Sequence, residues 1–571
     1  MNTELLGIIA TYAITLLVAI PLGRYIAKVF AGQRTLLDFM APLERGIYRF
    51  CGIDPKEDMN WKQHLKALLT INILWFVYGF FMLIFQDRLP LNPDHNAAQT
   101  PDLAFNTVIS FLVNCDLQHY SGESGVTYLT QLFVITFLQF VSAATGIAAL
   151  VAVFKALRQK TTTQLGNFWD HLLKTTTRIL LPICIVIAGI LAFRGTPASF
   201  AGKDTIVTVQ GDTVQVSRGP AAGMIAIKHV GTNGGGWFGA NSIHPLENPD
   251  YLTNMTEAVA QMIIPIAMVF ALGFFIQRKK FAYVIFGVMT AGMLAIMIPT
   301  ILSETGGNPA ISQMGIAQVS GAMEGKEVRF GPMATAYWST ITTIVSTGSV
   351  NGFHDSTMPL TGMMELIAMM TNCFYGGCGV GILNYFVFII IAVFISGLMV
   401  GRTPEFMGHK VEAREMKIAA IVALLHPLLI LSGTALSSYA VAHGWGAGWA
   451  TQPGAWLNNP GHHGFSEMMY EYTSAAANNG SGFEGLTDNN LFWNVTTGFV
   501  LLLSRFLPII CPVAIAGILA SKKYVPESAG TLRTDTATFG IMTFAVIAII
   551  AALAFFPALA LGPIAEYFSL Y

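Results

Sequence analysis

Apolar residues gather in ten long runs that are separated by more polar segments. A helix needs about 20 apolar residues to cross the roughly 30 Å of hydrocarbon in a bilayer. The runs lie near residues 5–23, 67–86, 127–154, 175–194, 256–277, 281–302, 382–400, 416–440, 491–520 and 541–562. No region between them is long enough for a large soluble domain. The pattern therefore predicts an all-α polytopic membrane protein with ten transmembrane helices.

Four shorter apolar segments lie in loops on one side of these spans. Each has roughly 12 residues, which is about 18 Å of helix and too short to cross a bilayer. Small polar residues or glycines follow each segment, at 114–116 after 101–113, at 231–236 after 219–230, at 346–349 after 332–345, and at 478–482 after 465–477. The successive intervals between Asn114, Asn233, Gly348 and Gly480 are 119, 115 and 132 residues. A unit of span, half-helix, polar loop and span is therefore used four times.

Repeated re-entrant loops favour an ion pathway. Irregular backbone at membrane depth is tolerated only where protein buries it or water reaches it. Loops that meet on one axis satisfy this condition, and their carbonyl oxygens can replace the hydration shell of an ion. The carboxyl end of each short helix carries about half a negative charge, and glycine lets successive carbonyls point the same way. With added side-chain oxygens from Thr, Ser and Asn, the pattern predicts a pore for a hard cation and leaves the ion open.

Composition narrows the class of protein. Only 11% of the residues are charged, 53% are hydrophobic and the mean hydropathy is +0.57. These values exclude a disordered chain, a disulfide scaffold and a typical soluble enzyme. The formal net charge of −1 gives no indication of a nucleic-acid partner. The six cysteines form no CxxC pair, which favours small apolar residues over a metal site.

Basic residues are divided unevenly between two sets of loops. The segments 24–66, 155–178, 278–280, 401–417 and 521–540 hold 23 Lys and Arg, whereas the opposite loops hold 7. The positive-inside rule places the first set in the cytoplasm and both termini outside. No Lys or Arg precedes the first span, which predicts that this span is retained rather than cleaved as a signal.

Two features inside the spans point to ion handling. Gly376, Gly377 and Gly379 interrupt the seventh span between half-helices at 358–374 and 382–400. Close packing is one explanation for such glycines, but their density favours a gate or coupling loop. Arg505 lies in the ninth span, where a buried charge costs roughly 2.5–3.5 kcal/mol and therefore suggests a function. A structural pair with a carbonyl or an acid is the alternative.

The sequence offers no means of using ATP. It contains no GxxxxGK[ST] motif, no Asp-Lys-Thr-Gly phosphorylation signature and no cytoplasmic loop that could house a nucleotide domain. Energy must therefore come from a partner or from a gradient. An integral-membrane enzyme would need a catalytic cluster, for which His462, His463 and Glu467 are the candidates. No convergent acid–base groups on other spans accompany them, so polar surface is the simpler interpretation.

Long motifs along almost the whole chain resemble one family. They lie at 118–123, 231–236, 241–249, 323–331, 401–405, 414–417, 463–467, 478–481 and 556–563. They are similar to motifs of the potassium-binding A subunit of the bacterial Kdp potassium-transporting P-type ATPase. The resemblance implies a fold akin to the Trk, Ktr and HKT potassium transporters, in which four membrane–pore–membrane repeats surround a central selectivity filter. The repeats would be 64–160, 161–278, 279–412 and 413–522, with extra spans in 1–63 and 523–571.

By residue match, the resemblance also implies the site. The potassium filter would consist of Asn114, Cys115, Thr232, Asn233, Gly234, Ser346, Thr347, Gly348, Asn478, Asn479 and Gly480. Gln118 matches a position beside the filter, and Arg505 matches a family arginine below it. Cys115 and Thr347 stand where members of the family vary. Asn372 stands where many relatives have Glu, which argues against an acidic role there.

The implied function is that of a non-hydrolysing, ion-selecting subunit. It would bind external potassium and pass it through the bacterial inner membrane within an ATP-driven uptake complex. Its partners would be an ATP-hydrolysing P-type subunit, a small single-span subunit, a short accessory peptide and the lipid bilayer. Potassium is the transported ion, and no other cofactor is implied. A stand-alone Trk-like channel or ion-coupled carrier is the alternative.

Overall fold

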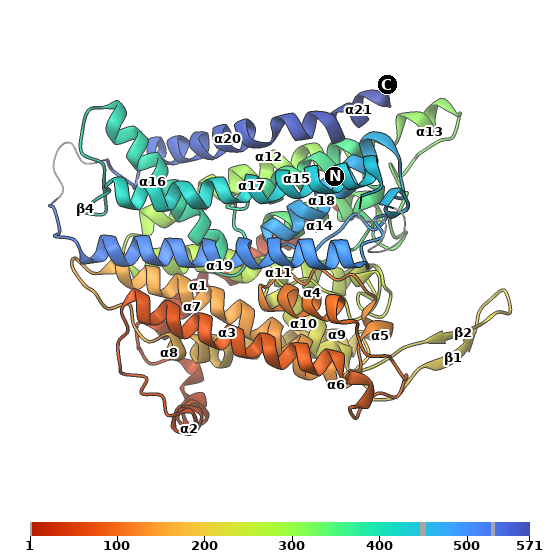
Figure 1. Ribbon diagram of the computed structural model, residues 1–571, viewed down its shortest axis with the longest axis horizontal. Coiled ribbons are helices and arrows are strands. Elements are labelled where there is room, and N and C mark those ends of the chain that lie inside the picture. Colours follow the sequence, from red (N-terminus) through yellow and green to blue (C-terminus); the bar gives the residue numbers. More distant parts are fainter. Residues whose placement is uncertain (1–2, 446–452, 527–531, 571) are drawn as a thin grey trace.

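The computed structural model describes residues 3–445, 453–526 and 532–570. Ten of its helical stretches are long and apolar enough to cross a membrane: Thr3–Phe30, Trp61–Ile84, Tyr128–Arg158, Phe168–Phe193, Tyr251–Phe275, Lys279–Gln313, Val380–Met399, Ala413–His443, Leu491–Ser521 and Ala537–Ser569. They run roughly side by side along the long axis of the molecule (Figure 1). Each overlaps one predicted span, so the all-α polytopic fold is confirmed.

Several of the spanning helices begin at polar caps. The main helices of the spans are α1 (Thr3–Phe30), α3 (Trp61–Ile84), α7 (Phe137–Arg158), α9 (Leu181–Phe193), α11 (Tyr251–Phe275), α12 (Lys279–Gly306), α16 (Val380–Met399), α17 (Ala413–His443), α19 (Leu491–Ser521) and α20 (Ala537–Leu559). Asn60 caps α3, Asp250 caps α11 and Asn490 caps α19 by accepting from backbone amides of the first turn. Such a cap contributes about 0.5–2 kcal/mol. Because caps are polar, hydrophobicity alone misses the first turn of α3 and of α11.

Four short helices match the four predicted half-helices. They are α4 (Pro101–Leu112), α10 (Ala221–Val230), α14 (Gly331–Ile344) and α18 (Gly461–Ala477). Each packs between the two spans that flank it in sequence, with α15 (Pro359–Thr371) as the second neighbour of α14. All four lie in the half of the molecule that holds both termini (Figure 1). The unit of span, half-helix and span is therefore visible in the packing.

The seventh span is broken, as predicted. Residues 372–379 separate α15 from α16, so the first half-helix ends three residues before its predicted end. Asn372 and Tyr375 have φ of 41° and 67°, and Gly376 and Gly379 have φ of 59° and 82°. Left-handed residues cannot continue a right-handed helix. The break is therefore a property of the backbone as well as of the glycines.

Smaller elements lie at the ends of the spans. β1 (Asp204–Val207) and β2 (Thr213–Val216) pair antiparallel, with Asp204 opposite Val216, and project from the end that holds the termini (Figure 1). β3 (Glu405–Phe406) and β4 (His409–Lys410) pair at the opposite end. The remaining α-helices are α2 (Ala41–Cys51), α5 (Gly122–Gly125), α6 (Tyr128–Thr130), α8 (Phe168–Thr175), α13 (Pro309–Gln313) and α21 (Ala565–Ser569).

The core lies between α7, α11, α16 and α19, which all contact one another apart from α11 and α19. In the most apolar window of the spans that contain α7 and α11, 89% of the residues are buried, against 22% for α1 and α3. A span enclosed on all sides is held by other helices rather than by lipid, so α7 and α11 can support a polar site. The short helices lie beside this core.

Candidate functional site

The four short helices end in loops that share one backbone conformation. The second residue of each loop donates its amide to a carbonyl five residues earlier, at 2.8–3.1 Å; the pairs are Cys115 with Ser110, Asn233 with Lys228, Thr347 with Thr342, and Asn479 with Ser474. The first residues, Asn114, Thr232, Ser346 and Asn478, have φ of 50–62°. The third residues, Asp116, Gly234, Gly348 and Gly480, have φ of 59–107°. We call 114–116, 232–234, 346–348 and 478–480 ring loops 1 to 4.

The ring loops touch one another in cyclic order. A Cβ atom on Gly234 would lie 2.1 Å from the carbonyl oxygen of Thr347, and one on Gly348 would lie 2.2 Å from that of Asn479. A Cβ atom on Gly480 would lie 1.9 Å from the carbonyl oxygen of Cys115. These three glycines therefore each abut the second residue of the next loop, in a space that no side chain can enter.

Hydrogen bonds between asparagines close the ring between loops 1 and 2. The Asn114 amide donates to the carbonyl oxygens of Gly231 and Thr232 at 3.1 and 2.7 Å. The Asn233 amide donates to Asn114 Oδ1 at 3.0 Å and to Ser142 Oγ, on α7, at 3.1 Å. All four ring loops are thereby brought together from positions more than 360 residues apart in the sequence.

The carbonyl oxygens of the second residues are left without partners. Among the residues that the structure describes, none donates a hydrogen bond to the carbonyls of Cys115, Asn233, Thr347 or Asn479. Buried carbonyls are normally paired, because leaving one unpaired costs free energy. Four unpaired carbonyls in a closed ring are a set of hard oxygen ligands of the kind that a cation needs.

The side chains of the ring loops act mainly as ties between segments. Asn478 donates to Ser504 Oγ at 2.9 Å, and Asn479 donates to the carbonyl of Thr342 at 2.8 Å. Thr232 Oγ1 accepts from the amide of Cys378 at 2.8 Å. We expected Thr, Ser and Asn to add side-chain ligands, but these contacts occupy most of those groups. The available ligands are therefore the backbone carbonyls together with Asn233 Oδ1 and Thr347 Oγ1, which are buried and have no hydrogen-bond partner.

Gln118 lies beside the ring, as the resemblance implied. Its side-chain amide accepts from the Gly236 amide N–H at 2.5 Å and donates to the Gly236 carbonyl at 3.2 Å. A primary amide that pairs with both polar groups of one residue fixes two loops in register. Gln118 thus joins the segment after ring loop 1 to the segment after ring loop 2.

Asp116 is a ring residue that sequence reasoning did not select. It occupies the position at which the other three ring loops have glycine, and its side chain is buried. Asp116 Oδ2 accepts from Gln139 Nε2, on α7, at 2.7 Å, whereas Oδ1 has no partner. The signal was present in the sequence, because superposing the four loops residue by residue places Asp116 opposite Gly234, Gly348 and Gly480.

A hollow lies outside the ring and carries acidic groups. The third residues of loops 1, 3 and 4 line it together with Gln118, His119, Glu484 and Asp488. Burial raises the pKa of the half-buried Asp488 to about 7, with an opposing effect of His119, whereas Glu484 is exposed to solvent. The charge of the hollow therefore changes near neutral pH.

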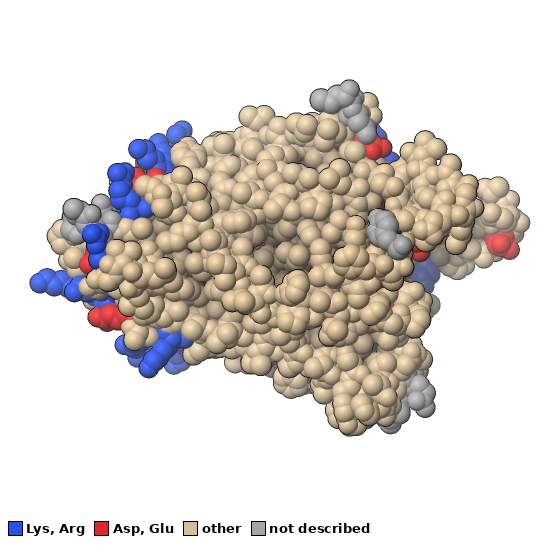
Figure 2. Space-filling model, turned by 90° about the horizontal axis from the view of Figure 1, so that it is seen from above, with Lys and Arg blue, Asp and Glu red and all other residues tan. Residues whose placement is uncertain are grey.

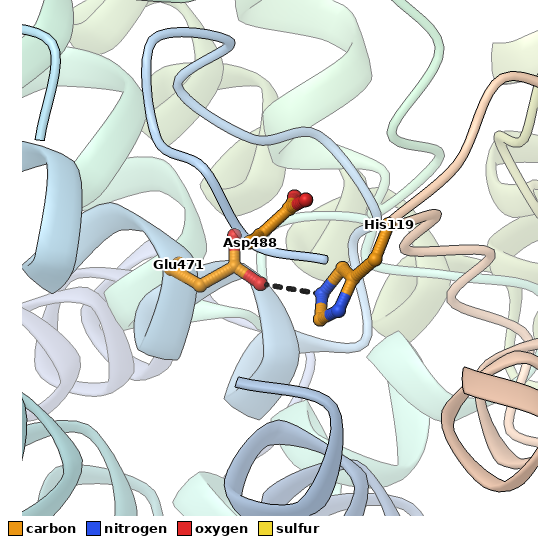
Figure 3. Close-up of side chains that lie close together, drawn as sticks. All are labelled: His119, Glu471 and Asp488. Atoms are coloured by element: carbon orange, nitrogen blue, oxygen red, sulfur yellow. Dashed lines mark hydrogen bonds and ion pairs between the residues drawn. The ribbon is translucent and has the colours of Figure 1, made fainter. Parts of the chain in front are cut away.

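His119, Glu471 and Asp488 could be taken for a metal centre, because each has a ligand atom within 4.8 Å of the others. Figure 3 shows the Glu471 carboxylate facing the His119 ring, with Asp488 beside them. His119 Nε2 lies 3.1 Å from Glu471 Oε1, and Nδ1 lies 2.6 Å from Asn494 Oδ1. The Asn494 amide nitrogen donates to Asp102, and this bond orients Asn494 Oδ1 toward the imidazole of His119.

Both ring nitrogens of His119 therefore face acceptors and must donate, which is the pattern of an imidazolium. Burial lowers the pKa of His119, but the neighbouring Asp488 and Glu471 carboxylates have a larger opposite effect, so the pKa is raised to about 9. Neither nitrogen has a free lone pair for a metal. The cluster is an ion pair that ties the segment after ring loop 1 to α18.

The break in the seventh span lies against the ring. A Cβ atom on Gly377 would lie 3.5 Å from Thr232 Oγ1 and 3.7 Å from the Ser346 side chain. Asn372 accepts from Ser346 Oγ at 3.0 Å and donates to the carbonyl of Ala477 at 3.2 Å. With the bond from Cys378 to Thr232, the segment 372–379 contacts ring loops 2 and 3 and the end of α18.

Gly376 and Gly379 in this segment allow close backbone contact. A Cβ atom on Gly376 would lie 2.3 Å from Gly381 Cα, and one on Gly379 would lie 2.4 Å from the carbonyl oxygen of Gly146, on α7. Both residues also have positive φ. Close packing therefore requires these two glycines, whereas a Cβ atom on Gly377 would have ordinary contact distances.

Arg505 lies next to the same segment and is buried. Its guanidinium donates to the carbonyl of Ser142 at 3.3 Å, and a Cβ atom on Gly146 would lie 3.0 Å from it. No carboxylate of the described residues pairs with it. A carbonyl contact of this kind was the structural alternative, but it leaves the positive charge without a counter-ion.

His463 and Glu467 lie with Asp355, each with a ligand atom within 4.8 Å of the others, and His462 is not part of this group. His463 bridges Asp355 and Glu566 at 2.9 and 2.7 Å, and His462 contacts the carbonyl of Leu561 at 2.9 Å. Glu467 is buried and accepts from Asn459 and from the amide of Asn458. Our interpretation of the two histidines as polar surface was wrong for His463, which together with Glu467 ties α18 to neighbouring segments.

Comparison with known proteins places the chain in a family. Residues 9–568 match the family described as potassium-transporting ATPase A subunit. The chain belongs to this family. Proteins described as potassium-transporting ATPase potassium-binding subunit are 67% identical in Flavobacterium psychrophilum and 63% identical in Bacteroides thetaiotaomicron, over all of both chains. The one from Geobacillus kaustophilus is 44% identical over 98% of each chain.

This chain also has a more distant similarity to a protein of known structure. The potassium transporter TrkH from Vibrio parahaemolyticus is 13% identical, with a TM-score of 0.48. The likeness covers 89% of this chain and 98% of that one.

Proposed function

We propose that the chain binds potassium at the ring loops and passes it across the membrane as the ion-selecting subunit of an ATP-driven uptake complex. The observation that carries this proposal is the closed ring of unpaired carbonyls at Cys115, Asn233, Thr347 and Asn479. The names of the relatives, which describe potassium-binding subunits, supply the ion.

The ring suits a large monovalent cation. Carbonyl dipoles replace the hydration shell, and the number and spacing of the oxygens decide which ion gains most. The carboxyl ends of α4, α10, α14 and α18 lead directly into the ring and add about half a negative charge each. The amide bonds five residues back into each helix and the asparagine ties hold the oxygens in place. A site held in this way resists collapse around a smaller ion.

The segment 372–379 with Arg505 is proposed as the gate on the other side of the ring. Gly377 lies next to residues of ring loops 2 and 3, and three hydrogen bonds hold the segment to the ring loops and to α18. A positive charge without a carboxylate partner below a cation site opposes passage unless it moves or is screened. Gly376 and Gly379 allow the tight backbone packing that the closed position requires.

The complex supplies the energy. We propose as partners an ATP-hydrolysing P-type subunit, a small single-span subunit and a short accessory peptide. Lys and Arg gather at the end that carries α2 and β4 (Figures 1 and 2), which supports a cytoplasmic position for that end and an outside position for both termini. The proposed location is the bacterial inner membrane. The four repeats with one extra span at each end remain the proposed organisation of the chain.

The test is purification of the native complex and measurement of ATP hydrolysis with different monovalent cations. Potassium is expected to stimulate hydrolysis, sodium is not, and the isolated chain is expected to hydrolyse no ATP. Hydrolysis by the isolated chain would contradict the assignment. Potassium flux through the isolated chain, with no hydrolysing subunit co-purifying, would favour a stand-alone channel or carrier instead.

A further inference from the structure

We propose that the Asp116 carboxylate is an affinity-determining group for the cation at the outer side of the ring; this inference rests on the proposed potassium pathway. Asp116 follows Cys115, whose unpaired carbonyl belongs to the ring, and it borders the acidic hollow outside. The other three ring loops have glycine at this position, so the charge comes from one quarter of the ring only.

No ion pair to Asp116 forms among the described residues. Gln139 donates one hydrogen bond to Oδ2, and Oδ1 has no partner, although the residue is only 1% exposed. Burial raises the pKa of Asp116 well above its ordinary value, with a smaller opposing effect of Lys228, on α10, which already binds Glu247 and donates to Asn241 Oδ1 at 2.6 Å. A buried carboxylate without a counter-ion is costly. The transported cation, held by the neighbouring carbonyls, supplies the missing positive charge.

The backbone at Asp116 would accept glycine with less strain than aspartate. Its φ of 59° lies in the left-handed region, where glycine is the least strained residue and Asp is one of the few tolerated alternatives. A Cβ atom on the neighbouring Gly235 would lie 2.9 Å from Asp116 Cβ, so ring loop 1 and the segment after ring loop 2 are fitted around this side chain. Glycine would suit the backbone, but it would remove the charge.

An electrostatic role makes a quantitative prediction about ion valence. Coulomb energy is proportional to the charge of the ion, so loss of one carboxylate has twice the energetic effect on a divalent ion as on a monovalent one. If the affinity for K⁺ falls about tenfold, the affinity for Ba²⁺, which has a similar size, falls about a hundredfold. The affinities for K⁺ and for Rb⁺ should fall by the same factor. A distorted ring would instead alter the ratio of K⁺ to Rb⁺.

The experiment compares Asp116→Asn and Asp116→Gly in the purified complex. Asn keeps an acceptor for Gln139, and Gly is the residue that the other three loops have. Asp212→Asn, in the exposed turn between β1 and β2, is the control for loss of one carboxylate away from the ring. The measurements are the K⁺ and Rb⁺ concentrations for half-maximal ATP hydrolysis and the Ba²⁺ concentration for half-inhibition. Both Asp116 variants are expected to follow the valence rule, and Asp212→Asn is expected to match the wild type.

The outcomes separate this inference from the proposed function. If the wild-type complex shows no K⁺ stimulation, the proposed function fails. If the wild type responds and both Asp116 variants match it, only the inference about Asp116 is overturned. The inference is also overturned if the affinities for K⁺ and Ba²⁺ fall by equal factors, or if neither variant assembles. Either result makes Asp116 a structural residue.

Discussion

The ring loops and the segment 372–379 are both irregular backbone inside a helical membrane protein, yet they are held differently. Side chains tie the ring loops to one another, and each loop is bonded back into its own short helix. The segment 372–379 rests on close backbone contacts of Gly376 and Gly379, on three hydrogen bonds toward the ring loops and α18, and on two more from Gly376 and Cys378 to the ends of α14 and α10.

This difference separates two tasks. A selective site must keep its oxygens at fixed positions, and many ties over several segments achieve this. A gate must be able to adopt a second conformation. A segment that is held largely by backbone contacts, without large side chains to displace, can move at a lower cost in free energy. The ring loops are therefore expected to respond to substitution in affinity and selectivity, and the lower segment in rate.

The largest effect is expected for Gly234→Asp in ring loop 2. Gly234 has φ of 93°, and its Cβ would meet the carbonyl of Thr347, so the side chain must displace a proposed ligand. Potassium affinity should fall by about a hundredfold or more, with a narrower preference over sodium and rubidium. Gly234→Ser should do the same more mildly, and Gly348→Asp and Gly480→Asp should resemble Gly234→Asp. Growth at limiting potassium and cation competition in the purified complex measure both effects.

The control for these variants is Gly223→Ser in α10, because nothing lies within 4 Å of a Cβ at Gly223. Gly236, two residues beyond ring loop 2, is unsuitable, since its Cβ would lie 2.5 Å from the carbonyl of Phe238. Wild-type affinity and selectivity in Gly234→Asp would show that ring loop 2 does not line the ion path.

The next effect is expected for Arg505→Ala. A positive charge about 8 Å from a bound cation costs roughly 2 kcal/mol at an effective dielectric constant of 20, which is about thirtyfold in affinity. Removal of the charge should tighten potassium binding or make the pathway leaky to potassium without ATP. Half-saturation of ATP hydrolysis and passive flux in vesicles measure the two possibilities. Unchanged values in a well-assembled variant would leave Arg505 with only its contact to the Ser142 carbonyl.

A smaller effect is expected for Gly377→Ala. The added methyl group has ordinary contact distances, the nearest being 3.5 Å to Thr232 Oγ1, so the protein should assemble. It would crowd the path next to the ring and resist movement of the segment. We expect kcat for potassium-stimulated hydrolysis to fall about fivefold with little change in KM, which is a barrier change of roughly 1 kcal/mol. Gly287→Ala in α12, with nothing within 4 Å, is the control. A changed KM at constant kcat would show that Gly377 acts on ion binding at the ring loops rather than on gating.

The smallest effect is expected from pH in the outer hollow. Burial raises the pKa of Asp488 to about 7, so this carboxylate becomes neutral as the external pH falls from 8 to 6. His119, with a pKa of about 9, stays mostly charged over this range. Loss of negative charge should weaken potassium binding by about threefold, since the group is partly screened. Asp488→Asn should show a flat profile over this range. A profile as steep as that of the wild type would exclude Asp488 as its source.

Local properties of the sequence predicted much of this architecture. The length of an apolar run decides whether a helix crosses the membrane, so ten spans and four half-helices followed from hydrophobicity. Four glycines within six residues marked the break in the seventh span. The caps at Asn60 and Asp250 explain why α3 and α11 begin before the apolar runs.

Contacts between distant segments were not predictable in the same way. Asn494 and His119 are 375 residues apart, and only the fold shows that they meet and that this contact fixes the protonation of the His119 imidazole. The use of Asn and Thr side chains as ties rather than ligands depends on which neighbour each loop finds. Asp116 stood in register with three glycines, but its buried, half-paired carboxylate became evident only with Gln139 from another helix beside it.

The most direct test of the ring is to locate a heavy monovalent cation in the assembled complex. Crystals or frozen samples prepared with Rb⁺ or Tl⁺ in place of K⁺ would show the ion by anomalous scattering or by added density. We predict a peak enclosed by the carbonyl oxygens of Cys115, Asn233, Thr347 and Asn479, and its removal by excess K⁺ but not by Na⁺. A cation bound at His119, Glu471 and Asp488, with no density inside the ring, would contradict the account.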